Sequence, residues 1–297
     1  MGLATFIGGI HPYEGKELSE NKPVQVLMPK GDLVYPMSQH IGAPAKPLVA
    51  KGDHVLAGQK IGEAGGFISA NVIASVSGTV KAIEPRRMAN GAMVPSIIVE
   101  NDGEYKTIEG VGEDRDPSTL SKEEIRSIVK EAGIVGLGGA TFPTQVKLMP
   151  PPGSKAEIII INAVECEPYL TSDHSLMMEK TEQILVGVTL LMKAVNVTKA
   201  VIGIENNKPD AIALMQKLAA GYKGIEIMPL KVQYPQGGEK QLIDAVIRRQ
   251  VKSGALPISA GAVVQNVGTA YAVYEAVMKN KPLFERVVTV TGKAVAN

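Results

Sequence analysis

The chain has 297 residues, of which 45% are hydrophobic and 21% are charged, so it is long enough to bury two cores and too apolar to be disordered. Lys and Arg number 31 against 30 Asp and Glu, which excludes a strong net field that would attract nucleic acid or an anionic membrane. The single cysteine, Cys166, excludes an internal disulfide framework and an iron–sulfur cluster held by four thiolates of this chain alone.

Neither the first residues nor the apolar runs predict a signal or a membrane span. The N-terminal stretch MGLATFIGGIHPYEG lacks the basic region and long apolar core of a secretory signal. The runs EIIIINAV and ILVGVTLLMKAV are shorter than the ~20 residues that cross a bilayer. We therefore expect a soluble chain in a reducing compartment.

The first part of the chain, from Val24 to about Glu104, is expected to form a small all-β unit. Period-two alternation of apolar residues between Gly and Asp turns is typical of short strands. Strands are predicted within the segments 24–29, 51–68, 71–85 and 94–102.

Two of these segments, KGDHVLAGQKIG and SVSGTV, resemble the half-barrels of biotinyl and lipoyl carrier domains. Carrier domains present a modifiable lysine at the tip of the hairpin between these halves, but here the tip is EAGGFISAN. Because it has no lysine to modify, we interpret residues 1–112 as a barrel-sandwich hybrid domain with a docking or structural role.

A polar stretch, NDGEYKTIEGVGEDRDP, separates this domain from the rest of the chain. Ser118 or Thr119 is expected to cap the next helix, and Gly133 is expected to end it. Glu123 and Glu124 would lie in its first turn, where the helix dipole favours negative charge.

Strands and helices then alternate along residues 113–284. Buried strands are expected at AEIIIINAV, AVIGIEN and IEIMPLKVQYP. Helices are expected from Asp173 or Ser175 onward, after Asn207 with Pro209 in the first turn, and over EKQLIDAVIRRQV. This alternation predicts a mostly parallel, layered α/β sheet.

The last residues, 285–297, contain the alternating sequence RVVTVTGK. They are expected to begin a further β-rich domain that this sequence does not complete. The alternative is a strand that pairs back onto the first domain.

The loop GLGGATFPTQVK, residues 136–147, is a candidate anion site. Its glycines leave main-chain N–H groups uncovered, so that a ligand can approach them closely. Thr144, after Pro143, is able to cap a short helix, and Lys147 adds a full positive charge. The pattern suits a phosphate, but a tight turn explains the glycines equally well.

Two carboxylates, Glu165 and Glu167, follow a buried strand in INAVECEPYLTSD, and Asn162 lies at the end of that strand. Ligands collect at the carboxyl ends of strands in open α/β sheets, so these side chains are candidates for a binding site. Alternatively, the carboxylates cap the next helix or lie solvated in a loop. YPQGGEK and VVQNVGTAYA repeat the theme of small and polar residues after later apolar runs.

Other reactive side chains predict less. The histidines His11, His40, His54 and His174 are scattered, and their spacing predicts no metal site. Cys166 lies between two glutamates, whose negative charge is expected to raise the pKa of its thiol rather than to activate it.

Five stretches carry a resemblance to a known family: GIVGLGGATFPTQVKL, INAVECEPYLTSDH, IENNKPDAI, YPQGGEKQLI and VQNVGTAYAVYEAV. Together they closely resemble RnfC, a subunit of the Rnf electron-transport complex, which is a membrane-associated, ion-translocating ferredoxin:NAD oxidoreductase. The resemblance extends from FIGGIHPYEGK to the last residue. RnfC is similar in turn to the NADH-oxidising flavoprotein of respiratory complex I, which implies a layered α/β domain that binds FMN and NADH.

The resemblance also implies roles for individual residues. FMN would contact the glycine loop and three further loops, through Gly136, Gly138, Gly139, Lys147, Asn162, Glu165, Tyr234, Gly238, Glu239, Asn266 and Thr269. The nicotinamide nucleotide would face Gly139, Ala140, Phe142 and Glu167.

The chain departs from the complex I loops at four positions. Leu137 stands in place of an arginine, Val164 of an aspartate, Cys166 of a glycine and Lys240 of a glutamate. The loss of an arginine and an aspartate changes the local charge, whereas the glycines and the lysine of the loop are retained.

The implied activity is hydride transfer between NAD(H) and bound FMN, with no side chain acting as a catalytic acid or base. Family members usually continue into a ferredoxin module with 4Fe–4S clusters, whose cysteine runs do not occur in this sequence, so a partial activity is expected of the chain alone. The implied partners are NADH, the other proteins of the complex and a ferredoxin-type cluster module or subunit, on the cytoplasmic face of the cell membrane.

Two other roles remain open from the sequence. The same fold serves as a largely non-catalytic scaffold in the sodium-pumping quinone reductase, and one relative of RnfC is an electron-transfer partner of the soluble proline reductase. The retained glycine loop, Lys147 and Glu167 favour the enzyme.

Overall fold

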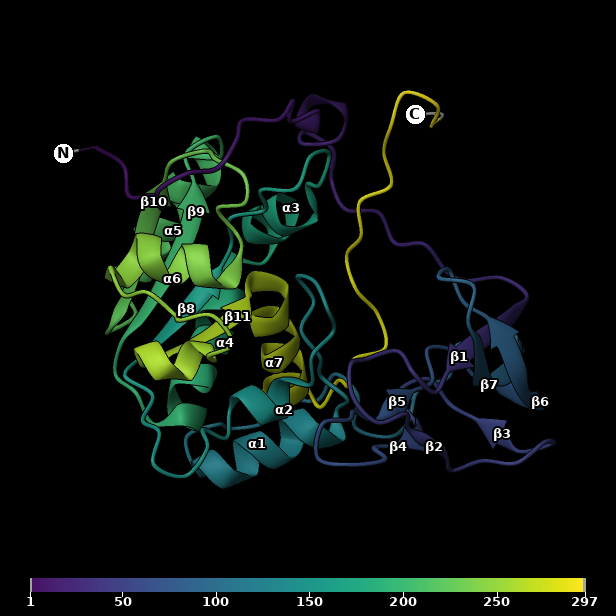
Figure 1. Cartoon of the computed structure of the whole chain (residues 1–297). Coiled ribbons are helices and arrows are strands. Elements are labelled where there is room, and N and C mark those ends of the chain that lie inside the picture. Colours follow the sequence, from purple (N-terminus) through teal and green to yellow (C-terminus); the bar gives the residue numbers. More distant parts are fainter. Residues whose placement is uncertain (1, 296–297) are drawn as a thin grey trace. The chain divides into compact units, whose positions relative to one another are not determined.

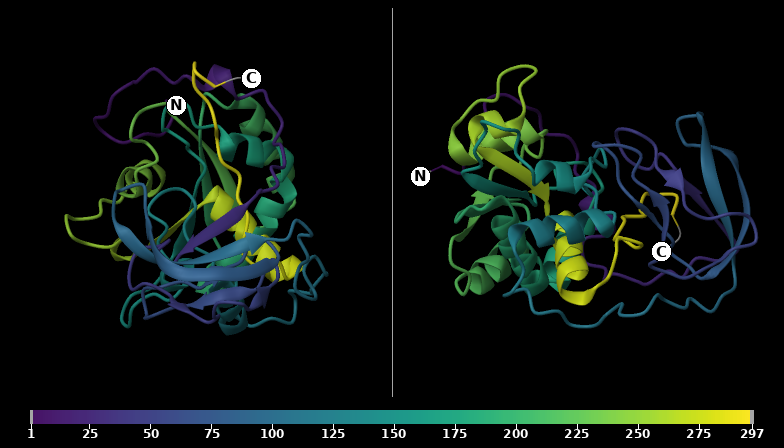
Figure 2. Two further views of the ribbon diagram at one scale, coloured as in Figure 1. Left: turned by 90° about the vertical axis from the view of Figure 1, so that its right-hand side faces the viewer. Right: turned by 90° about the horizontal axis from the view of Figure 1, so that it is seen from below.

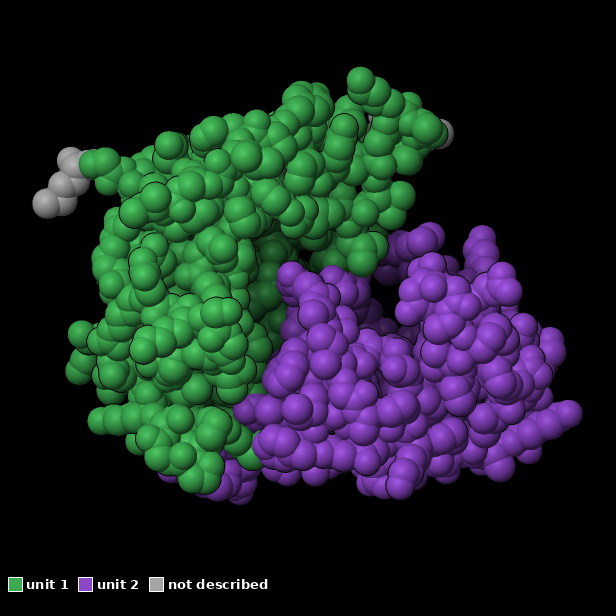
Figure 3. Space-filling model, in the orientation of Figure 1, with its two compact units in different colours: residues 1–25, 147–271, 287–297 green, residues 26–146, 272–286 purple. Residues whose placement is uncertain are grey.

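The computed structural model describes residues 2–295 (Figure 1). The chain folds into two compact units, which Figure 3 distinguishes by colour. Unit 1 comprises Met1–Gln25, Lys147–Tyr271 and Val287–Asn297, and unit 2 comprises Val26–Val146 and Ala272–Arg286. The first 25 residues therefore belong with the later part of the chain, whereas the sequence predicted a first domain over residues 1–112.

Unit 2 contains two antiparallel sheets, so the predicted half-barrel of short strands is confirmed. One has the strand order β1-β7-β6-β3 and the other the order β2-β4-β5. Their strands are β1 (Asp32–Pro36), β2 (Lys46–Pro47), β3 (His54–Val55), β4 (Lys60–Glu63), β5 (Val72–Ile73), β6 (Gly78–Arg87) and β7 (Met93–Asn101). The long β6–β7 hairpin is drawn in blue in Figure 2.

Apolar side chains from both sheets form one core in unit 2, with Val55, Ile61 and Ile97 wholly buried. The segment 24–29, predicted to be the first strand, forms no strand, and Val26 and Leu27 are 86% and 90% exposed. That prediction was wrong because the alternating side chains of this segment cover no core.

The hairpin tip between β4 and β5 packs on helix α1 (Lys122–Glu131), which also lies in unit 2. Asn71 Nδ2 donates to the main-chain carbonyls of Lys130 and Glu131 at 3.2 and 3.3 Å. A Cβ on Gly133 would lie 2.7 Å from the carbonyl oxygen of Asn71, so only glycine fits there. The tip that holds a lysine in carrier domains is used here for a structural contact.

Helix α1 was predicted, but its N-cap was placed at the wrong residue. Ser121 caps the helix by accepting from the N–H of Glu124, and the Glu124 carboxylate accepts from the N–H of Ser121. Ser118 and Thr119 lie outside the helix. The Ser-x-x-Glu spacing of this capping box was present in the sequence.

Unit 1 is built on a parallel sheet with the strand order β10-β9-β8-β11, which confirms the predicted α/β layers. The strands are β8 (Ile158–Asn162), β9 (Ala200–Glu205), β10 (Ile225–Leu230) and β11 (Ala262–Asn266). Its helices are α3 (Ser172–Glu179), α4 (Thr181–Val195), α5 (Pro209–Ala219) and α6 (Glu239–Ile247). Two further helices, α2 (Thr144–Lys147) and α7 (Val267–Lys279), cross the division between the units.

The single long helix predicted after Asp173 or Ser175 is two helices. Lys180, with φ −131° and ψ 31°, leaves the helical region and separates α3 from α4. The strand predicted within 285–297 is not seen in its described part, which forms no strand up to residue 295. Residues 296 and 297 lie outside the described residues.

The strand order places a topological switch point between β8 and β11. The chain leaves β8 toward β9 on one side and reaches β11 from β10 on the other. Ligands of open α/β sheets bind outside the carboxyl ends of the strands at such a point. Asn162 and Asn266 are register partners at these two strand ends.

Over residues 2–295, the structure contains no helix that combines the length and the apolar character needed to cross a membrane.

Candidate functional site

Two amides connect the loops at the switch point of unit 1. Asn266 Nδ2 donates to Asp173 Oδ2 at 2.7 Å and to the carbonyl of Asn162 at 3.4 Å. Asn162 Nδ2 donates to the carbonyl of Gly237 at 2.8 Å. Residues that follow β8, β10 and β11 are therefore held together at one edge of the sheet.

Lys147 does not stand as a lone cation, as the sequence suggested. Its Nζ donates to Glu239 Oε1 at 2.6 Å and to the carbonyl of Val264 at 3.2 Å. The side chains of Lys147 and Glu239 remain 31% and 37% exposed. Two residues predicted to bind the same cofactor thus meet in unit 1, and an incoming anion would have to compete with Glu239 for the ammonium.

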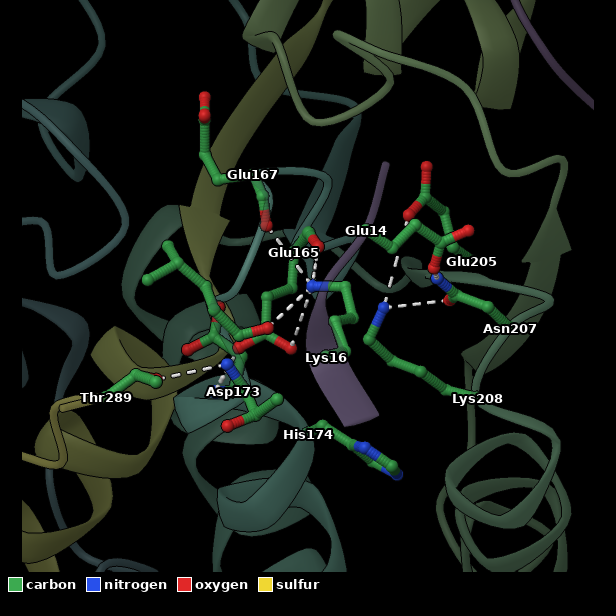
Figure 4. Close-up of polar contacts among 12 residues, drawn as sticks. Glu14, Lys16, Glu165, Glu167, Asp173, His174, Glu205, Asn207, Lys208 and Thr289 are labelled. Atoms are coloured by element: carbon green, nitrogen blue, oxygen red, sulfur yellow. Dashed lines mark hydrogen bonds and ion pairs between the residues drawn. The ribbon is translucent and has the colours of Figure 1, made fainter. Parts of the chain in front are cut away.

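Glu165 is buried in the loop after β8, with a left-handed backbone at φ 52°. Its Oε1 accepts from the N–H of Asp173 at 2.7 Å, so it does bind the first turn of α3, as the alternative interpretation expected. Its Oε2 has no hydrogen bond and lies 3.9 Å from Nζ of Lys16 (Figure 4). A buried acceptor without a donor is costly, and a ligand hydroxyl would relieve that cost.

Glu167, two residues later, is exposed and points away from Lys16 in Figure 4. The hydroxyl of Tyr234 donates to its Oε1 at 3.2 Å. This hydrogen bond is the main reason that the pKa of Tyr234 is raised. The two carboxylates therefore differ in role, since one is buried and structural and the other faces solvent.

Cys166 lies half-buried between them. Burial is the main cause of the raised pKa of its thiol, and the charges of Glu205 and Glu167 add less. The direction of the predicted shift is correct, but its expected cause, repulsion by the flanking glutamates, is the smaller one. The N–H of Gly237 donates to Sγ at 3.3 Å, which ties the thiol to the loop after β10.

A small cavity lies beside this cysteine, also in unit 1. It has a volume of about 50 Å³ and is lined in part by Lys16, Cys166, Glu205 and Tyr234. Such a volume accommodates a few water molecules and is far too small for a tricyclic ring. It is therefore not the cofactor site that the resemblance implies.

The glycine loop lies in unit 2. The N–H of Gly136 donates to the carbonyl of Phe142 at 2.9 Å, so the loop does make a tight turn. A Cβ on Gly139 would meet no atom within 4 Å, which leaves open space beside the main chain. Both interpretations of the loop therefore apply.

Thr144 does not cap a helix. It is the first residue of α2, its N–H donates to the carbonyl of Ile134 at 3.0 Å, and its buried hydroxyl has no hydrogen-bond partner. The expected cap was wrong because the residue enters the helix itself.

An arginine that the sequence did not predict lies at the glycine loop. Arg286 Nη2 donates to the carbonyl of Leu137 at 2.8 Å, at the position where the complex I loop has an arginine. Both residues belong to unit 2, and the guanidinium is exposed. The 149 residues that separate them explain why no local pattern could reveal this contact.

The other predicted site residues have different surroundings. Gly238 is the N-cap of α6, and a Cβ there would lie 2.5 Å from Gln241 Oε1. Thr269 is wholly buried in α7. Ala140 is exposed in the glycine loop. In all, unit 1 holds Lys147, Asn162, Glu165, Glu167, Tyr234, Gly238, Glu239, Asn266 and Thr269, and unit 2 holds Gly136, Gly138, Gly139, Ala140 and Phe142.

Comparison with known proteins identifies two parts of the chain. A family model described as the RnfC barrel sandwich hybrid domain matches residues 4–104, and one described as the Nuo51 FMN-binding domain matches residues 129–275. The RnfC subunit of the proton-translocating ferredoxin:NAD(+) oxidoreductase complex of Clostridium ljungdahlii is 45% identical over 293 residues, which cover 99% of this chain and 64% of that protein. The chain belongs to the RnfC family.

A second relative is the RnfC subunit of the Na(+)-translocating ferredoxin:NAD(+) oxidoreductase complex of Acetobacterium woodii. It is 47% identical over 299 residues, covering 99% of this chain and 66% of that protein. The chain therefore spans less than two thirds of the length of both relatives. Among solved structures, an NAD+-reducing [NiFe]-hydrogenase in the H2-reduced state shares 26% sequence identity at a TM-score of 0.46, over 55% of this chain and 32% of that chain.

Proposed function

We propose that this RnfC-family chain binds FMN and NAD(H) and is the NADH-facing part of an Rnf-type ferredoxin:NAD oxidoreductase. The observation that supports the proposal best is the joining of predicted site residues at one edge of the parallel sheet. Asn162 is bonded to the loop that contains Gly238, Glu167 is bonded to Tyr234, and Lys147 is paired with Glu239.

The chemistry of these groups suits FMN. The free Oε2 of Glu165 is an acceptor for a hydroxyl, and the ribityl chain carries hydroxyls. The open space at Gly139 leaves main-chain amides accessible to a phosphate, and Arg286 adds a positive charge to the same loop. Lys147 would supply a second cation by exchanging Glu239 for the cofactor.

When bound, FMN would supply the hydride chemistry with the nicotinamide nucleotide. The role of the side chains is to bind and orient. The exposed carboxylate of Glu167, oriented by Tyr234, would accept hydrogen bonds from nucleotide hydroxyls. The raised thiol pKa of Cys166 keeps that side chain neutral and unreactive.

The relatives are named as subunits of ion-translocating complexes, so we extend the same assembly to this chain. Its partners would be the other proteins of such a complex and a ferredoxin-type carrier of single electrons with 4Fe–4S clusters. The chain would bind peripherally at the cytoplasmic face of the membrane through those partners.

The test is to add FMN to the purified chain, record the visible spectrum and then titrate NADH without oxygen. We expect tight flavin uptake and loss of its visible absorbance as NADH is added. Gly139→Leu should abolish uptake without unfolding, because a Cβ there meets no protein atom; Gly2→Leu, at another such position, is its control. Lys147→Ala should weaken uptake, with exposed Lys155→Ala as its control.

The opposite result is also informative. A wild-type chain that never takes up flavin would overturn the proposal and favour a non-catalytic scaffold. Flavin uptake without reduction by NADH would retain the cofactor and remove the nucleotide from the proposed function.

A further inference from the structure

The N-terminal segment, residues 2–16, runs across the carboxyl ends of three strands in unit 1 (purple in Figure 1). Ala4 forms a parallel bridge with Leu230 at the end of β10. Ile10 and Tyr234 exchange two main-chain hydrogen bonds of 2.8 Å in the loop after this strand. These contacts bring the segment to the loops that contain the candidate site.

The segment then contacts the loops after β9 and β8. Asn207 Nδ2 donates to the carboxylate of Glu14 at 2.6 Å, and the N–H of Tyr169 donates to the carbonyl of Glu14 at 2.7 Å. A Cβ on Gly15 would lie 2.4 Å from the Tyr169 ring, so the approach is close. The segment therefore connects the loops that follow β8, β9 and β10.

Lys16 ends this segment as a buried ammonium group, only 6% exposed. Its Nζ donates to three main-chain carbonyls of one loop, those of Glu165, Glu167 and Leu170, at 2.9, 3.2 and 2.5 Å (Figure 4). It also lies 3.9 Å from Glu165 Oε2. An ammonium has three protons, and here all of them have an acceptor in the same loop.

The shape of that loop depends on a cation at this position. Glu165 and Tyr169 both have left-handed backbones, at φ 52° and 67°, which non-glycine residues adopt only when their surroundings impose it. Three carbonyl oxygens that converge on one point repel one another unless a donor lies between them. Lys16 is that donor, although it comes from 149 residues earlier in the chain.

We propose that Lys16 is a positioning residue, which holds the loop Glu165–Leu170 in the form that binds FMN and nicotinamide nucleotide. The inference rests on the proposed function, since it assigns a determinant of that same site. The ammonium fixes the main chain of both carboxylates and leaves Glu165 Oε2 without another donor. The side chain of Glu167 is then directed toward Tyr234.

The first measurement uses the flavin-free chain, so that it does not depend on cofactor binding. In Lys16→Met, hydrogen exchange should accelerate about 10- to 100-fold at the amides of Tyr169 and Asp173, which are bonded to Glu14 and Glu165. Amides of β9 should keep their rates. The exposed Lys155→Met is the matched control and should exchange as the wild type does.

The second measurement is the dissociation constant for FMN, from fluorescence titration. Lys16→Met should bind FMN about 10- to 100-fold more weakly, because the loop must be ordered at the expense of binding. Lys16→Gln keeps a hydrogen-bond donor without the charge, should retain the wild-type thermal midpoint and should give an intermediate affinity. If Lys16→Met does not fold, Lys16→Gln alone decides the question.

The outcomes separate this inference from the proposed function. Unchanged exchange and unchanged FMN affinity in a folded Lys16 variant would overturn the inference, while reduction of wild-type flavin by NADH would still support the proposed function. A wild type that does not bind FMN would overturn the proposed function and the ligand-binding role of Lys16 with it. A drop in FMN affinity with wild-type exchange rates would also overturn the positioning role.

Discussion

Glu205, the last residue of β9, should make the stability of unit 1 depend on pH. The residue is 1% exposed, and its pKa is raised to about 7, chiefly by burial. A hydrogen bond from the N–H of Gln233 at 3.0 Å and the charge of Lys208, whose Nζ lies 4.0 Å from Oε2, favour the ionised form but do not offset burial. At neutral pH this carboxyl therefore holds a proton part of the time.

The sign and size of the effect follow from the two pKa values. Because the folded pKa lies above the usual 4.5, the stabilisation is fully present below pH 4.5 and is lost as the pH rises through about 7. The interval of roughly 2.5 units corresponds to about 3 kcal/mol at ~1.4 kcal/mol per unit. Glu205→Gln mimics the protonated form, so its free energy of unfolding should lack this loss.

The assay is urea unfolding of the wild type and the variant at about pH 5 and about pH 8, followed by circular dichroism and by hydrogen exchange of β9. The two proteins should differ by less than about 1 kcal/mol at the lower pH, and the variant should be more stable by about 3 kcal/mol at the higher. Glu226→Gln, on exposed β10, is the control and should follow the wild type. Parallel pH profiles for wild type and Glu205→Gln would refute the reasoning.

Three further substitutions test other parts of the structure. Gly187→Ala should lower the free energy of unfolding by about 3 kcal/mol or more, because its Cβ would lie 2.0 Å from the carbonyl oxygen of Ala270; an unchanged thermal midpoint would contradict the packing of α4 on α7. Ser121→Ala should cost about 1 kcal/mol in urea unfolding through loss of the capping box, and more than Ser118→Ala, which lies outside the helix. Arg286→Gln should weaken FMN binding about 10-fold at an unchanged midpoint, and equal affinity would exclude a role for this exposed guanidinium in the anion cradle.

Patterns that are local in sequence predicted most of the fold. The alternation of buried strands with helices predicted the parallel sheet of unit 1, and the alternating segments predicted most strands of unit 2. Exceptions arose where a local pattern had no core to cover, as in the exposed Val26 and Leu27. A helix break at Lys180 was missed because the apolar period continues on both sides of it.

The candidate site was predictable as a set of loops but not as a set of contacts. Asn162 and Asn266 were found because they end apolar strands, and the sheet brings such ends together. Lys16 and Arg286 were not found, because each reaches its loop from 149 residues away along the chain. The N-terminal segment forms only isolated bridges and one short 3₁₀ turn, so no periodicity marks it as part of the α/β unit.

Buried charge explains why those distant residues matter. Lys208 Nζ, like that of Lys16, donates to a main-chain carbonyl of the loop after β8, at 2.9 Å from Val164, and burial lowers its pKa. Removing an ammonium from water costs several kcal/mol, which only acceptors at fixed positions offset. Two ammonium groups from separate segments thus constrain the same loop from different sides. Its conformation is consequently a property of unit 1 as a whole, whereas its candidate ligand-binding carboxylates are encoded within a few residues of one another.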